Sequence, residues 1–101
     1  MDRRLKLQQE LTNILGSNNV YFQPPPTVSI NYPCIIYERE SGDSKHADNS
    51  TYSFKFRYKV TYIGRKPEND IVKKILELPM CRYDRFYAAD GLNHDVFSIY
   101  Y

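Results

Sequence analysis

Two histidines each lie close to an aspartate in this chain of 101 residues. His46 precedes Asp48 by two positions, and His94 is followed at once by Asp95. A histidine and aspartate pair can bind zinc or act as a general base, but either role needs a third group that converges on the same point. The spacing assigns no such group, so the sequence favours surface hydrogen bonds for both pairs.

Three aspartates toward the C-terminal end, Asp84, Asp90 and Asp95, are the other candidates for a metal site. Their spacing matches no oxygen-ligand loop for a divalent cation, and turn capping accounts for them better. The sequence also contains no phosphate-binding glycine loop, no HExxH zinc motif and no GxSxG nucleophile elbow. We therefore predict a protein that is not an enzyme, with no catalytic residue, no metal site and no cofactor.

Three cations alternate with apolar residues along 52–63, namely Lys55, Arg57 and Lys59. Successive side chains of a strand point to opposite faces, so the pattern predicts a strand with a basic face and a core face that includes Phe56. A strand of about twelve residues would be roughly twice the usual length, so part of it should project. The aromatic side chains lie opposite the cations, which favours solvent or a protein partner over single-stranded nucleic acid for the basic face.

The elements that position these residues follow from hydrophobic periodicity and from proline and glycine. We predict helices over 2–15 and 67–78, strands over 19–23, 32–39 and 96–100, and an irregular stretch between Met80 and the last strand. Residues 40–51 are polar and rich in turn formers, which predicts an extended, flexible loop. The fold class is α+β, an antiparallel or mixed β-sheet with a long projecting hairpin, packed against an N-terminal helix and a second helix.

Composition limits the remaining possibilities. The length predicts a single domain over 1–101. A net charge of +2 is too small to indicate nucleic-acid binding by itself, although basic residues prevail over 52–74 and acidic residues over 75–101. Cys34 and Cys81 lack metal-site or redox spacing, which predicts free thiols in a reducing compartment. No stretch has the pattern of a secretion signal or a membrane span, so we expect a cytoplasmic protein.

Several stretches resemble the tail-completion proteins of long-tailed phages, and in particular the tail terminators. The likeness spans nearly the whole chain and is carried by 32–38 (YPCIIYE), 47–49 (ADN), 58–63 (YKVTYI), 78–79 (LP) and 87–97 (YAADGLNHDVF). Gly91 stands where such sequences carry asparagine, and both residues tolerate the positive φ that a tight turn requires.

The resemblance implies a virion structural protein, a minor tail or head-tail joining component. Family members form a ring, usually of six copies, that caps the head-proximal end of the tail tube, stops tube polymerisation and offers a surface to the head connector. The implied partners are other copies of the chain, which can be a monomer when free, the tail tube protein and the connector or neck protein. No membrane is involved, and DNA is only passing cargo. The implied location is the virion tail or neck, after assembly in the host cytoplasm.

Two alternatives remain open at this point: a head-completion or connector protein of the neck, and a small single-stranded nucleic-acid-binding module. The expected interface with neighbouring subunits or the tail tube combines the basic strand face, the polar loop and the C-terminal region. Its residues are Lys55, Arg57, Lys59, Asp43, Lys45, His46, Asp48, Asn49, Arg82, Arg85, Asp90 and His94.

Overall fold

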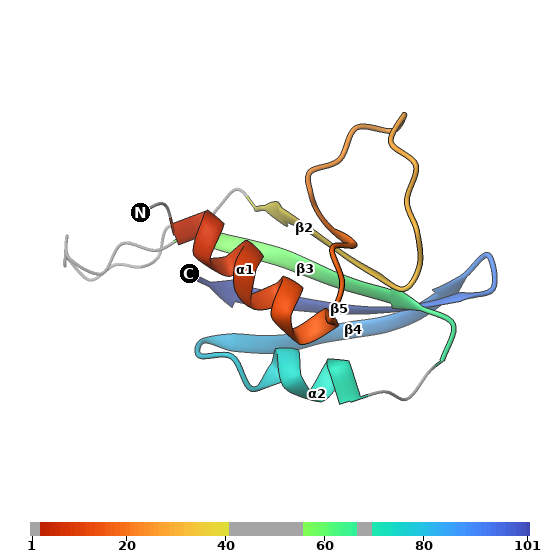
Figure 1. The fold of residues 1–101 in the computed structure, drawn as a ribbon. Helices are drawn as coiled ribbons and strands as arrows, with labels where there is room; N and C mark the ends of the chain where they lie inside the picture. Colours follow the sequence, from red (N-terminus) through yellow and green to blue (C-terminus); the bar gives the residue numbers. More distant parts are fainter. Residues whose placement is uncertain (1–2, 41–55, 67–69) are drawn as a thin grey trace, which may run out of the picture.

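A single five-stranded sheet organises the chain in the computed structural model, which describes residues 3–40, 56–66 and 70–101 (Figure 1). The strand order is β1-β2-β3-β5-β4, in which β1 and β2 are parallel and all other neighbours are antiparallel. The predicted α+β class with a mixed sheet is therefore confirmed. The strands are β1 (Val20–Phe22), β2 (Cys34–Arg39), β3 (Arg57–Gly64), β4 (Cys81–Ala89) and β5 (Leu92–Tyr100).

Two helices, α1 (Arg3–Leu15) and α2 (Asp70–Leu76), cover one face of this sheet, and Figure 1 views the sheet from their side. We call this the helix face. The opposite face carries no helix in the described part of the chain, and we call it the open face. An antiparallel sheet tolerates such an arrangement because one pleated face can be apolar while the other is polar.

The helix α1 forms as its apolar spacing predicts. Leu7 and Leu11, one turn apart, are both fully buried against the sheet. Gly16 ends the helix in the left-handed region, with φ of 81°, and its N–H donates to the Thr12 carbonyl at 2.9 Å.

The helix α2 is shorter than the predicted span 67–78, of which residues 67–69 lie outside the described part. Ile75 is fully buried, whereas its neighbour Leu76 is 42% exposed. Asp70 in the first turn and Lys73 and Lys74 in the last complement the helix dipole.

The core on the helix face is rich in tyrosine, and its polar groups are satisfied. Tyr37 is fully buried, its hydroxyl donates to Gln8 Oε1 at 2.6 Å, and it accepts from Arg4 Nη1 at 3.3 Å. A buried tyrosine needs such a partner, so α1 both covers the sheet and completes its hydrogen bonding.

The long third strand differs from its prediction. In the structure β3 begins at Arg57, and Phe56, expected in the core, is 38% exposed at the end of the sheet. The guanidinium carbon of Arg39 lies 3.9 Å from the centre of the Phe56 ring. Residues 52–55, and with them the projecting part of the predicted hairpin, lie outside the described residues, as does the loop 40–51 apart from Glu40.

The C-terminal region also differs, because a stretch predicted to be irregular is the nine-residue strand β4. It pairs with β5 through a tight turn in which Asp90 and Gly91 have φ of 54° and 75°. Two successive residues with positive φ suit the twist of a two-residue hairpin. The strand β5 begins at Leu92 and not at residue 96, so His94 lies in a strand and not in the predicted loop.

Candidate assembly surface

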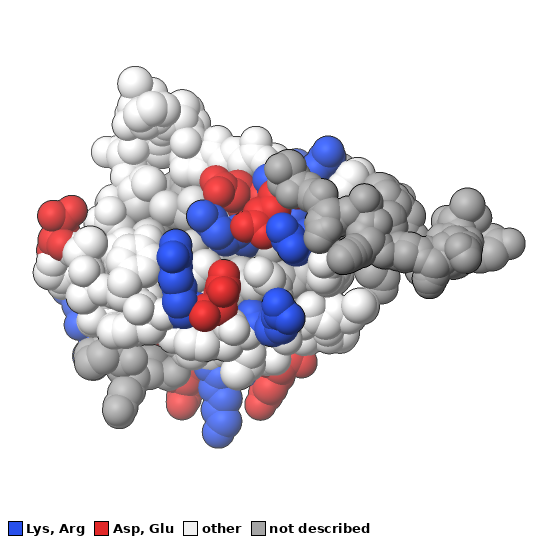
Figure 2. Space-filling view, turned by 180° about the vertical axis from the view of Figure 1, so that it is seen from behind, with Lys and Arg blue, Asp and Glu red and all other residues white. Residues whose placement is uncertain are grey.

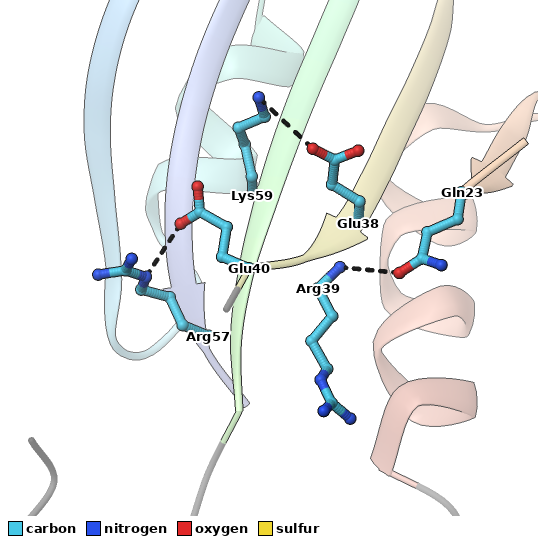
Figure 3. A network of polar contacts seen from close by, with 6 residues as sticks. All are labelled: Gln23, Glu38, Arg39, Glu40, Arg57 and Lys59. Carbon is cyan, nitrogen blue, oxygen red and sulfur yellow. Dashed lines mark hydrogen bonds and ion pairs between the residues drawn. The ribbon is translucent and has the colours of Figure 1, made fainter. Parts of the chain in front are cut away.

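The cations of β3 lie on the open face, as their alternation predicts, but they do not form an uncompensated basic surface. Arg57 Nε lies 2.9 Å from Glu40 Oε1, and Lys59 Nζ lies 3.5 Å from Glu38 Oε2 (Figure 3). The two glutamates alternate along β2 and its end in the same way as the cations along β3, so the antiparallel register places opposite charges side by side. Arg57 and Lys59 thus lie on the predicted face, but their charges are paired there with those of Glu40 and Glu38, while Lys55 lies outside the described residues.

Two arginines of the C-terminal region, Arg82 and Arg85, join the same open face. Register places Arg82 beside Ser98, which in turn lies beside Lys59, and it places Arg85 beside Val96. Neither arginine has an acidic partner among the described residues. Figure 2, which views the open face, shows charges of both signs interleaved over it. The uncompensated positive charge thus lies on β4 and not on β3.

His94 lies on the open face and stacks on Tyr87 of the neighbouring strand. Their ring centroids are 4.6 Å apart and the planes are 13° from parallel. The Nδ1 atom of His94 is buried and has no hydrogen-bond partner among the described residues. His94 therefore contributes an aromatic contact between β4 and β5, while His46 and Asp48 lie outside the described part.

The three aspartates weighed as a metal cluster do not converge. Asp95 is 5% exposed on the helix face, where its Oδ1 accepts a hydrogen bond of 2.7 Å from the Tyr83 hydroxyl. Asp90 lies in the turn that joins β4 to β5, and Asp84 lies at the bulge between Tyr83 and Arg85. Within 3–40, 56–66 and 70–101, no group of three potential metal-ligating side chains is present.

The contact between Tyr83 and Asp95 changes the titration of the phenol. Partial desolvation, followed by the hydrogen bond to Asp95 and the charge of that carboxylate, raises the pKa of Tyr83 to about 12. The same causes, with Glu10 as the carboxylate, raise the pKa of Tyr101 to about 12. Each phenol is thus held in its neutral, donating form across the physiological range.

The two cysteines are free thiols, as predicted. Burial raises the pKa of Cys34 and that of Cys81 to about 11 in each case. Thiols with such raised pKa values carry little thiolate near neutral pH, so neither has the electrostatic surroundings of a reactive cysteine.

The edge strand β4 is the most exposed element of the sheet. In the described part of the chain it pairs with β5 alone, and all of its residues after Cys81 are exposed. Large apolar side chains lie on or beside this edge: Leu76 (42% exposed), Met80 (57%), Tyr83 (40%), Phe86 (47%) and Tyr87 (41%). A long edge strand with unpaired backbone groups and exposed aromatic rings is suited to adding another chain.

The opposite edge of the sheet is much less available. It is formed by β1, which is only three residues long and leads into Pro24, Pro25 and Pro26. Proline has no N–H to donate, so this segment is a poor template for strand pairing. The Arg39 N–H at the end of β2 donates to Gln23 Oε1 at 3.2 Å, which further occupies this side (Figure 3).

The structure thus brings five of the expected interface residues to one face and separates others. Arg57, Lys59, Arg82, Arg85 and His94 share the open face, while Asp90 is at the tip of the β4–β5 turn. The loop residues Asp43, Lys45, His46, Asp48 and Asn49 lie outside the described part, as does Lys55. The sequence analysis did not identify Glu38 and Glu40 as partners of the cations, nor the exposed aromatic side chains of β4. The alternation of β4 becomes recognisable only when Asp84 is treated as a bulge residue.

Comparison with known proteins adds no family to this picture. The sequence matches no protein-family model and no curated protein, and the structure matches no solved structure. None of the described helices is both long and apolar enough to span a bilayer.

Proposed function

We propose that this chain is a structural protein of a phage virion, a tail terminator that forms a ring on the head-proximal end of the tail tube. In this role it stops tube polymerisation and provides the surface to which the head connector binds. It acts through protein contacts and carries out no catalysis. The sequence stretches that resemble tail terminators, above all 32–38 and 87–97, support this proposal, and they contain most of β2 and of β5, which both pair with β3, and the turn before β5.

The exposed β4 edge is the observation that carries the assembly role. A closed ring of identical subunits requires two different surfaces on each subunit, each complementary to the other. The aromatic rings of Tyr83, Phe86 and Tyr87 and the unpaired backbone of β4 provide one such surface, with Arg82 and Arg85 beside it. An edge of this length left bare in a monomer invites nonspecific aggregation, so a neighbouring subunit gives it a stable cover.

The ion pairs of the open face argue against the alternative function, a small single-stranded nucleic-acid-binding module. Arg57 and Lys59 each face a glutamate of β2 or its end, so a phosphate would have to displace a carboxylate that is already in place. Nucleic-acid binding gains much of its affinity when unpaired cations of the protein neutralise phosphates and release their counterions. The proposed partners are therefore other copies of the chain, the tail tube protein and the head connector, and DNA passes without sequence recognition.

Electron microscopy of particles assembled without this protein tests the proposal. Disruption of the gene in the encoding phage should yield over-long or headless tails, because nothing then ends tube growth. Restoration of the gene in trans should return tails of normal length. Tails of normal length beside heads that leak DNA would overturn the terminator role and indicate the neck connector instead.

A further inference from the structure

One corner of the sheet gathers the start of α1, the start of β4 and the end of β5 (Figure 1). The strand β5 extends past its partner there, because Cys81, the first residue of β4, is paired with Ile99. The N–H of Tyr100 donates to the Met80 carbonyl at 3.3 Å, and the N–H of Tyr101 donates to the Phe56 carbonyl at 3.0 Å. The corner is therefore held by backbone bonds and leaves side chains to form its surface.

Two hollows of about 280 and 290 Å³ flank this corner, and both are lined by Met80 and Tyr100. The first opens beside β4, and its other lining residues are Arg57, Cys81, Arg82 and Ser98. The second opens beside α1, and its other lining residues are Arg3, Lys6, Pro79 and Tyr101. Met80 lies between them, is 57% exposed and has φ of 61°.

Among the described residues, each hollow is lined by two cations and by no aspartate or glutamate. Arg57 already faces Glu40 at 2.9 Å, but Arg82 in the first hollow and Lys6 in the second have no acidic partner among the described residues. The exposed thioether of Met80 between them is a flexible apolar contact that adapts to many side-chain shapes. An apolar centre with a free cation on either side is complementary to an apolar residue flanked by carboxylates.

We infer that this corner binds an acidic, extended segment of a partner protein, with an apolar side chain on Met80 and a carboxylate at each of Arg82 and Lys6. Carboxylates form charge-assisted hydrogen bonds with both kinds of cation. Single-stranded nucleic acid fits less well, because its binding sites track a continuous charged backbone and stack successive bases, whereas here the cations lie in two separate hollows.

A short labelled peptide, Asp-Glu-Leu-Glu-Asp with blocked ends, probes the site by fluorescence anisotropy. We expect it to bind the wild-type chain. The neutral peptide Asn-Gln-Leu-Gln-Asn, which lacks the carboxylates, should bind roughly tenfold more weakly, a difference of about 1.4 kcal/mol in binding free energy. Lack of binding of the acidic peptide, or equal binding of the neutral one, overturns the inference.

Two matched double variants then locate the binding. Lys6→Gln with Arg82→Gln removes the free cation of each hollow, and Lys66→Gln with Lys74→Gln removes the same charge from exposed positions elsewhere. We expect roughly tenfold weaker peptide binding by the first and less than a twofold change by the second, with thermal unfolding of both close to wild type. Equal losses in the two variants would show a bulk charge effect and contradict the site.

The apolar contact is tested by a double-mutant cycle. Met80→Ser should weaken binding of the leucine peptide but leave binding of the peptide with serine in place of leucine unchanged. Equal effects on both peptides would remove Met80 from the site. Displacement of the acidic peptide by a thymidine oligonucleotide at lower concentration than by unlabelled peptide would replace the proposal with a nucleic-acid site.

Discussion

Phe56 and Tyr58, two aromatic residues of the same strand parity, show why strand alternation predicts the face of a side chain but not its burial. Phe56 and Tyr58 share the parity of core positions, and Tyr58 is 4% exposed. Phe56 is nevertheless 38% exposed, because it lies just before β3, where the sheet ends. Its ring is contacted there by the Arg39 guanidinium. Where the sheet and its helices end cannot be read from one strand's pattern.

Truncation of Phe56 should therefore cost less than truncation of the fully buried Phe97 of β5. Phe97→Ala should lower the free energy of unfolding by about 3–5 kcal/mol, because this side chain is fully buried and leaves a cavity. Phe56→Ala should cost only about 1–2 kcal/mol, since part of the ring is already in water. Chemical denaturation of both variants measures the difference, and equal losses would contradict the placement of Phe56.

The hydrogen bond from Tyr83 to Asp95 is a second residue-scale test. Tyr83→Phe removes the donor that this 5% exposed carboxylate has at 2.7 Å and should cost about 1–3 kcal/mol of unfolding free energy. Tyr87→Phe is the control, because that ring stacks on His94 and its hydroxyl has no hydrogen-bond partner within the described residues; it should stay within about 0.5 kcal/mol of wild type. A neutral Tyr83→Phe would show that Asp95 does not depend on this bond.

The same phenol makes stability depend on alkaline pH. The pKa of Tyr83 is raised from 10.0 to about 12 in the folded chain, so the folded state favours the neutral form. Its contribution is complete below the unfolded pKa and is lost as pH rises from about 10 to about 12. Urea unfolding across this range should show a decline that is shallower in Tyr83→Phe. Identical slopes would contradict a raised pKa, and the comparison removes the parallel contributions of Tyr101 and the two thiols.

At the scale of elements, the sequence predicted the helices and the strands whose patterns are regular and missed the one with an extra residue. Leu7 and Leu11 in α1 and Tyr58, Val60 and Tyr62 in β3 repeat at the expected periods and lie in the core. In β4 the bulge at Asp84 shifts the alternation by one, and the strand is exposed, so neither periodicity nor hydrophobicity indicated it. Only its pairing with β5 defines it.

The conformation of the turn between β4 and β5 can be tested by substitution of Gly91. Gly91 has φ of 75° with no atom within 4 Å of an added Cβ, so Gly91→Ala is strained only through its backbone. It should cost about 1–2 kcal/mol of unfolding free energy. Gly91→Asn should cost less, because asparagine tolerates the left-handed region. Equal losses in the two variants, measured by denaturation, would show that the turn does not hold this conformation.

At the scale of the whole molecule, the strand pattern predicted which face carries the basic side chains of β3 but not that acidic side chains neutralise them. The strand pattern placed Arg57 and Lys59 on one face, and they lie there, but neutralisation by Glu38 and Glu40 depends on the register of two strands that are well separated in the sequence. The exposed edge likewise depends on the strand order, which places β4 outside β5. These are properties of tertiary arrangement that local sequence does not specify.

The β4 edge makes the ring proposal testable by a matched pair of variants. Phe86→Lys places a charge on the exposed edge, and Leu5→Lys places one at a similarly exposed apolar position on α1, 49% against 47% exposed. A charge at an edge blocks the approach of another chain. Phe86→Lys should therefore fail to complement a disrupted gene in a plaque assay while Leu5→Lys complements it. Full complementation by both, with normal folding, would remove β4 from the assembly surface.

Addition of the purified chain to growing tail tubes tests the central claim most directly. Under the proposed terminator function, tubes polymerised from the cognate tail tube protein should stop lengthening when the chain is added, with a ring visible at one end by negative-stain electron microscopy. Their mean length should fall as the concentration of the chain rises. Tubes that keep their length distribution and carry no ring at either end would contradict the account.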